Sequence, residues 1–190
     1  YSNKFGYLVL STTNRSEAAV GYGTLYGATS GGLAVIKDVP KTMIFKLSRY
    51  LNEREGMEVV PNSVINRPPS AELRPNQKDQ DSLPPYDILD PIIDAILIEY
   101  MTIPEMIARW PQWEKHIRRT VKLVSSNEYK RRQTPPGLKI TRRAFGKDWR
   151  LPIGIPSTSF DPWLDDSEPL DFAMTAAMQA VVNVERLNKE

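Results

Sequence analysis

The sequence predicts an α/β fold with a parallel sheet, and two observations support this. Residues 7–10 form an apolar run rich in β-forming side chains, which is typical of a strand buried in a parallel sheet. Hydroxyl residues 11–13 follow, and Asn14 or Ser16 can then cap a helix that starts near Glu17. Open α/β folds place ligands where a strand ends in a polar loop before a helix, because the free amides of the helix attract anions.

Short elements and loops alternate through the rest of the first quarter of the chain. The first helix is expected over residues 17–25, followed by a flexible loop over residues 26–32. An apolar run at residues 33–36 indicates a second strand or an extended segment. Pro40 suits the first turn of the next helix, and Gly56 ends that helix. An apolar stripe at helical spacing follows Pro40 and consists of Met43, Ile44, Leu47 and Leu51.

Prolines shape the middle of the chain. Residues 59–74 are expected to be extended, because Pro68 and Pro69 exclude a regular helix there. Such a rigid backbone would hold Ser70 and Glu72 in fixed directions, although a plain proline-rich linker explains the composition equally well. Residues 76–85 are expected to form a polar loop.

Helices dominate the second half of the prediction. Apolar periodicity predicts helices over residues 87–100, 103–108 and 112–129. Residues 130–136 follow as a basic exit that ends at Pro135, Pro136 and Gly137. After a loop-rich stretch, residues 168–187 are expected to form a C-terminal helix.

Composition excludes several kinds of chemistry. The 190 residues are 41% hydrophobic and 25% charged, and no apolar run is long enough to span a membrane. No signal peptide is visible, so we expect a cytoplasmic protein, and the non-Met start suggests a fragment of a longer chain. The absence of cysteine excludes disulfides, thiolate metal sites and a cysteine nucleophile. His116 is the single histidine, which argues against a Ser-His-Asp triad or a multi-histidine metal site.

Charge is unevenly distributed along the chain. Residues 109–150 hold thirteen Lys or Arg against three Asp or Glu, whereas residues 161–190 hold seven acids against two bases. The basic segment is either a solvated face or a site for phosphate or nucleic acid.

Three local patterns have competing interpretations. Lys41 lies in the first turn of a helix, where a cation is unfavourable unless an anion binds nearby or solvent screens it. The loop at residues 30–32 (SGG) lacks the residues of a phosphate-binding loop and is interpreted as a flexible connection. Four acids could bind a divalent cation or could be ordinary exposed loop acids: Asp79, Asp81, Asp87 and Asp90.

Several ordered motifs resemble the synthetase domain of the NAD synthetase family. They are residues 12–17 (TTNRSE), 21–22 (GY), 25–27 (LYG), 37–42 (KDVPKT) and 67–90 (RPPSAELRPNQKDQDSLPPYDILD). Residues 83–86 (LPPY), 129–137 (YKRRQTPPG) and 143–146 (RAFG) are similar to the glutamine-dependent branch of the family. We therefore expect residues 1–152 to be the C-terminal portion of a synthetase domain, and residues 153–190 to be a tail with a helix.

The resemblance implies a fold and a reaction. The fold is that of the adenine-nucleotide α-hydrolases, which is a Rossmann-like parallel sheet with helices on both faces. The reaction uses ATP to adenylate the nicotinate carboxylate of deamido-NAD with release of pyrophosphate. Ammonia, made from glutamine by a separate nitrilase-like domain, then displaces AMP to give NAD. This chemistry requires positioning and charge neutralisation and no protein nucleophile, so no residue is assigned a catalytic role.

The resemblance also implies roles for individual residues. Thr12, Lys41 and Ser70 would bind ATP, with Lys41 neutralising phosphate charge. Glu17 would hold a Mg²⁺ ion and contribute to the deamido-NAD site. Lys130 would contact deamido-NAD.

Departures from the family pattern leave alternatives open. Ala28 stands where the family has an acid, and Thr13 stands where it has glycine. The family's ATP loop and glutaminase domain are missing from this sequence, so we expect the isolated chain to be incomplete and inactive. Family members form homo-oligomers, and the helix at residues 87–100 is apolar enough to contribute. The alternatives are a catalytically degenerate nucleotide-binding relative and a nucleic-acid-binding module that uses residues 109–150.

Overall fold

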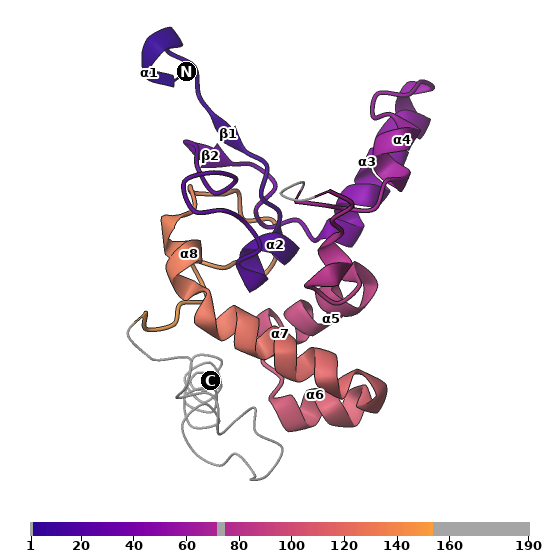
Figure 1. Cartoon of the computed structure of the whole chain (residues 1–190), viewed down its shortest axis with the longest axis vertical. Helices are drawn as coiled ribbons and strands as arrows, with labels where there is room; N and C mark the ends of the chain where they lie inside the picture. Colours follow the sequence, from indigo (N-terminus) through magenta and orange to yellow (C-terminus); the bar gives the residue numbers. More distant parts are fainter. Residues whose placement is uncertain (1, 72–74, 154–190) are drawn as a thin grey trace, which may run out of the picture.

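The computed structural model describes residues 2–71 and 75–153 and contains a small parallel sheet at one edge of a group of helices (Figure 1). Strand β1 (Leu10–Ser11) pairs with β2 (Leu33–Ala34), with Leu10 opposite Leu33 and Ser11 opposite Ala34. Gly137 continues the sheet through a parallel bridge to Ala34. The predicted α/β class and the parallel pairing are therefore confirmed. The predicted tail helix at residues 168–187 lies outside the described residues.

Burial of the first apolar run was predicted wrongly. Tyr7 is 65% exposed, Leu8 is 64% exposed and Leu10 is 53% exposed. The regular strand is also shorter than the run, and it follows a short helix, α1 (Ser2–Phe5), that was not predicted. Apolar composition identifies a strand, but its burial depends on neighbouring layers, and β2 is the strand that pairs with β1 in the described part of the chain.

Helix α2 (Arg15–Val20) begins after Asn14, as one of the two proposed caps predicts. The Asn14 side chain accepts a hydrogen bond from the Glu17 amide, and the Glu17 carboxylate accepts one from the Asn14 amide, which is a complete capping box. The helix begins two residues earlier than expected and stops before residue 25. Gly21 ends it with a φ of 66°, a left-handed conformation that glycine adopts without steric cost.

Helices α3 (Lys41–Glu55) and α4 (Asn62–Asn66) form an arm that extends away from the other helices (Figure 1). Gly56 ends α3 as predicted, whereas Pro40 is its N-cap and lies just outside the first turn. The predicted apolar stripe is not buried, since no α3 residue is buried. Helix α4 falls in a stretch that was expected to be extended, because the carbonyl of Pro61 accepts the amides that start a new helical turn.

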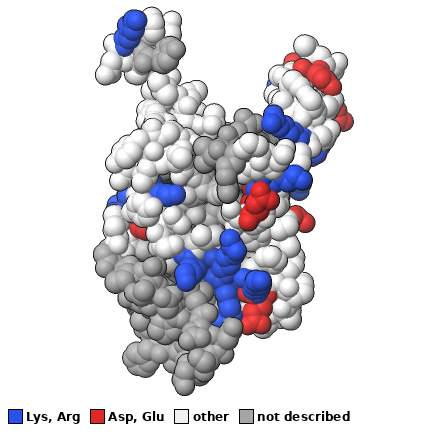
Figure 2. All heavy atoms as spheres, in the orientation of Figure 1, with Lys and Arg blue, Asp and Glu red and all other residues white. Residues whose placement is uncertain are grey.

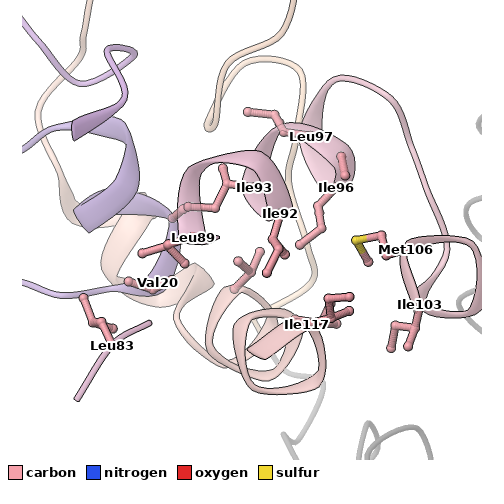
Figure 3. Close-up of a cluster of buried hydrophobic side chains, with 14 of the residues drawn as sticks. Val20, Leu83, Leu89, Ile92, Ile93, Ile96, Leu97, Ile103, Met106 and Ile117 are labelled. Atoms are coloured by element: carbon pink, nitrogen blue, oxygen red, sulfur yellow. The ribbon is translucent and has the colours of Figure 1, made fainter. Parts of the chain in front are cut away.

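The core lies among four helices: α2, α5 (Tyr86–Leu97), α6 (Ile103–Arg109) and α7 (Glu114–Ser126). Figure 3 shows their apolar side chains meeting between α5 and α7. The larger side chains that are at most 2% exposed there are Leu89, Ile92, Ile93, Ile96, Leu97, Met106, Ile117 and Val124. The apolar periodicity of residues 87–100 and 112–129 therefore corresponds to the buried faces of α5 and α7. The apolar face of α5 packs into this core.

In the second half of the chain, further helix ends differ from the prediction. Helix α5 stops at Leu97, three residues early, and Tyr100 then adopts a left-handed φ of 57°. The predicted helix at residues 112–129 is divided into the 3₁₀ turn η2 (Pro111–Trp113), α7 and the start of α8 (Glu128–Gln133). The expected basic exit is thus partly helical. A further 3₁₀ turn, η1 (Asp79–Asp81), lies in the predicted polar loop.

Hydropathy gives a separate result for the described helices. Within residues 2–71 and 75–153, none has the length and apolar character that crossing a membrane requires.

The contrast between the core and the arm predicts two different responses to truncation. Ile93→Ala is expected to lower the free energy of unfolding by about 2–5 kcal/mol, because it leaves a cavity in the core. Leu47→Ala, on the exposed side of α3, is expected to change it by less than about 0.5 kcal/mol. Urea denaturation followed by circular dichroism measures both values. Equal losses in the two variants would contradict this description of the core.

Candidate functional site

Two predicted site residues form an ion pair at the N-terminal ends of α2 and α3. The Lys41 ammonium lies 3.0 Å from a Glu17 carboxylate oxygen, and both side chains are 19% exposed. Each belongs to the first turn of its helix, where the free amides favour anions. The carboxylate of Glu17 is favourable in the first turn of α2. It also supplies the negative charge that compensates the unfavourable placement of the Lys41 ammonium in the first turn of α3.

A buried carboxylate on α5 holds these two helix ends together. Asp90 is 5% exposed, and one of its oxygens accepts hydrogen bonds from the Thr42 amide at 2.9 Å and the Thr42 hydroxyl at 2.7 Å. Its other oxygen accepts the hydroxyl hydrogen of Ser16. The Ser16 oxygen in turn accepts the Lys41 amide at 2.8 Å. Asp90 therefore caps α3, whose own N-cap residue, Pro40, offers no side-chain hydrogen bond.

Tyr86 and Asp79 form the next layer behind the ion pair. The Lys41 ammonium lies 5.7 Å from the centre of the Tyr86 ring, and the Tyr86 hydroxyl donates to Asp79 at 2.5 Å. Burial, together with this hydrogen bond, raises the pKa of Tyr86 far above its usual value. Burial and the nearby Asp79 charge also raise the pKa of Tyr22. Both phenols therefore stay protonated and neutral, and Tyr86 acts as a hydrogen-bond donor to Asp79.

The proline-rich segment joins the site through its backbone. The carbonyl of Pro69 accepts the Asp79 amide at 2.9 Å, which fastens the segment to the residue that also holds Tyr86. Ser70 follows directly and is partly exposed. The structure therefore connects Ser70 to the surroundings of Lys41 through Asp79 and Tyr86.

Thr12 and the loop that contains Ala28 lie beside the end of β1. The hydroxyls of Ser11 and Thr13 donate to the Ala28 carbonyl at 2.9 and 3.0 Å. Thr12 lies between them with its side chain exposed, so it faces away from this anchor. The backbone of residue 28 holds the loop in place, and the exposed Ala28 side chain does not contribute to these two bonds.

Lys130 reaches the same region from α8. Its ammonium donates to the carbonyls of Gly21 at 2.8 Å and Gly23 at 3.2 Å, directly after the end of α2. Lys130 and Glu17 line one small cleft, whose volume is about 10 Å³. The structure thus brings Glu17, Lys41 and Lys130 around the ends of α2.

The four acids of the middle segment do not form a metal site. Asp79 and Asp90 are buried in separate hydrogen-bond networks, whereas Asp81 and Asp87 are exposed. Among the described residues, no three His, Cys, Asp or Glu side chains are grouped closely enough to hold a metal. Mg²⁺ in nucleotide sites often needs only one or two carboxylates, because substrate phosphates supply further ligands. The single carboxylate of Glu17 fits that kind of site.

Sequence reasoning missed the structural roles of Ser16, Thr42 and Asp90. Asp90 was considered only as a member of an acidic cluster, although its spacing within an apolar helix face (Leu89, Ile92, Ile93) was a signal that it is buried. A buried carboxylate requires several donors, so it predicts a network even when the donors cannot be named.

The basic segment is partly neutralised in the folded chain. Five of its thirteen cations form ion pairs: Arg109 with Glu99, Arg118 with Glu114, Lys139 with Asp148, and both Arg131 and Arg132 with Glu128. Figure 2 shows basic groups gathered in one patch on the face drawn there, with acidic groups at its edge.

Removing the Asp90 charge tests the helix-joining network. Asp90→Asn places an amide donor against the donors of Ser16 or Thr42, so we expect the free energy of unfolding to fall by about 1–3 kcal/mol. Asp87→Asn is the matched control on the exposed side of the same helix and is expected to change it by less than about 0.5 kcal/mol. Urea titration measures the free energy of unfolding of both variants. An unchanged value in Asp90→Asn would show that the network contributes nothing to stability.

Comparison with known proteins gives a consistent result. Residues 1–134 match the family model described as NAD synthase. A glutamine-dependent NAD(+) synthetase of Aquifex aeolicus is 55% identical over 153 residues, which are 80% of this chain and 26% of that protein. The enzyme of the same name from Acinetobacter baylyi is also 55% identical, over 80% of this chain and 28% of its own length.

A solved structure agrees with the fold. A glutamine-dependent NAD(+) synthetase from Cytophaga hutchinsonii matches with a TM-score of 0.70 and 23% identity, over 88% of this chain and 27% of that chain. The present chain spans about a quarter of the length of the curated relatives it matches. With the family model covering residues 1–134, the chain belongs to the NAD synthase family.

Proposed function

We propose that the complete protein is a glutamine-dependent NAD synthetase, an ATP-using carbon–nitrogen ligase. The carboxylate of deamido-NAD attacks the α-phosphorus of ATP, and the bond to pyrophosphate breaks. Ammonia derived from glutamine then attacks the activated carbonyl carbon, and AMP leaves as the amide of NAD forms. The observation that carries this proposal is the Glu17–Lys41 pair, which lies within segments that match synthetases at 55% identity.

The ion pair supplies a switch between the free and ATP-bound states. Lys41 and Glu17 neutralise each other in the present structure, at 3.0 Å. Polyphosphate is a stronger partner for the ammonium than one carboxylate, and Mg²⁺ is a stronger partner for the carboxylate than one ammonium. We therefore expect ATP and Mg²⁺ to separate the pair, leaving Lys41 on phosphate and Glu17 on the ion. Mg²⁺ would supply charge stabilisation for the leaving pyrophosphate.

The remaining predicted residues would supply further contacts to the substrates. Thr12 and Ser70 offer hydroxyl donors for ATP at the end of β1 and beside Asp79. Lys130 offers a cation for the anionic dinucleotide, and its present partners are the carbonyls of Gly21 and Gly23. Exchange of neutral carbonyls for a phosphate group would favour binding, because charge-assisted hydrogen bonds are about twice as strong as neutral ones.

Other parts of the proposal concern the complete protein. The nitrilase-like glutaminase domain would lie in the part of the sequence beyond this quarter-length segment. We also propose a cytoplasmic location and a homo-oligomer. For the oligomer, the exposed apolar side chains Met43, Leu47 and Tyr50 of α3 offer a better surface than α5, whose apolar face is in the core.

The two alternatives are not favoured. A catalytically degenerate relative rested on Ala28, yet the named synthetases remain 55% identical across the segment that contains it. A nucleic-acid-binding module rested on residues 109–150, where several of the cations are already in ion pairs.

Replacing Lys41 in the complete protein tests the proposed role. Lys41→Met is expected to lower kcat/KM for ATP by about 10²–10³-fold, because one donor to the developing phosphate charge is lost. Lys46→Met, five residues along the same helix and exposed, is the matched control and is expected to retain full activity. Pyrophosphate release in the presence of deamido-NAD measures the rate. Unchanged turnover in Lys41→Met would remove Lys41 from the ATP site.

A further inference from the structure

A second, larger pocket adjoins the Lys130 cleft and shares Arg131 and Thr134 with it. It encloses about 260 Å³ between the turn after β2, the end of α8 and the loop that follows Pro136. None of Thr12, Glu17, Lys41, Ser70 or Lys130 lines it. The larger pocket is therefore separate from the residues assigned to ATP and deamido-NAD, and the proposed ligase reaction gives it no role.

The lining of this pocket is strongly basic. Six lining residues are Lys or Arg: Lys37, Arg131, Arg132, Lys139, Lys147 and Arg150. The one acidic residue in the lining, Asp38, already accepts the amides of Ile140 and Thr141, both at 2.8 Å. Its carboxylate is therefore used to hold the loop in place, and the pocket keeps an excess of positive charge.

Half of these cations have no acidic partner within residues 2–71 and 75–153. Arg131, Arg132 and Lys139 pair with Glu128 or Asp148. By contrast, Lys37 donates to the Thr134 hydroxyl and, at 3.0 Å, to the Pro135 carbonyl. Arg150 donates to the carbonyl of Gly146 at 2.5 Å. Neutral oxygens orient these cations without balancing their charge.

Among these cations, Lys37 is the one whose charged form is most disfavoured by the excess of positive charge. Burial lowers its pKa, and the positive charge of the neighbouring Arg131 lowers it further. An anion in the pocket would supply opposite charge at short range and would therefore raise the pKa of Lys37 again. The loop that follows Pro136 also packs closely against the end of β2, since a side chain at Gly137 would meet the Ala34 carbonyl at 2.9 Å. This close packing fixes the position of Lys37 against that loop.

We propose that this pocket binds a small phosphate-bearing anion through Lys37, Lys147 and Arg150. The volume lies just below the range of about 300–1,000 Å³ that encloses drug-sized ligands, so it suits a phosphate or diphosphate group. Phosphate oxygens accept the several charge-assisted hydrogen bonds that two ammonium groups and one guanidinium can donate. The proposal does not depend on the ligase activity, because the two sets of residues do not overlap.

Competitive labelling of lysines tests the proposal in the full chain. The protein is treated with an amine-acetylating reagent in inorganic phosphate or in sodium chloride of equal ionic strength, and modified peptides are quantified by mass spectrometry. We expect phosphate to slow the modification of Lys37 and Lys147 several-fold. Lys46 on α3 and Lys115 on α7 are exposed controls outside the pocket and are expected to react equally in both salts.

A matched pair of variants assigns the effect to the pocket. Arg150→Gln removes a proposed donor and is expected to raise the phosphate concentration that half-protects Lys37 by about tenfold or more. Arg142→Gln, an exposed neighbour in the same loop that does not line the pocket, is expected to leave it unchanged.

Three results would overturn the proposal. Equal protection of all four lysines would indicate a general effect of phosphate on reactivity. Protection of Lys41 without protection of Lys37 would place phosphate only at the ligase site. Protection of Lys37 that is the same in Arg150→Gln and in the unaltered chain would show that the pocket cations do not hold the anion together.

Discussion

The carboxylate of Asp90 is the contact on which the arrangement of the site depends. It accepts hydrogen bonds from Ser16 on α2 and from Thr42 on α3, while its own helix, α5, is anchored by the deepest apolar side chains of the core. Through these bonds the core sets the relative position of two helix N-termini. Glu17 and Lys41 lie one residue beyond Ser16 and one residue before Thr42, so the same bonds determine where their charges meet.

The residues that form the packed core are different from the residues assigned to the substrates. Helices α5, α6 and α7 supply the packed interior, and none of the residues assigned to ATP or deamido-NAD belongs to them. The assigned residues lie instead on helix ends and loops at the edge of that interior. Their polar groups keep partners that a substrate can replace, such as the Gly21 carbonyl for Lys130 and the Glu17 carboxylate for Lys41.

Sequence reasoning succeeded where one local signal decides the structure. The Asn14 cap, the Gly56 stop and the apolar face of α5 each follow from short-range patterns, and the order of motifs indicated the family. It failed where the outcome depends on distant segments. The stripe on α3 resembles a buried face but is exposed, and residues 7–10 resemble a core strand without being covered. The Asp90 network joins residues 48 and 74 positions apart, so a local pattern could indicate that Asp90 is buried but could not name its donors.

The most direct test of the account is a crystal structure of the complete protein with Mg²⁺ and a non-hydrolysable ATP analogue. The account predicts that the Lys41 ammonium has left Glu17 and contacts a phosphate oxygen, that Glu17 ligates the metal ion, and that the Asp90 bonds to Ser16 and Thr42 are unchanged. An analogue bound elsewhere, with the Glu17–Lys41 pair still closed at about the present 3.0 Å, would contradict it.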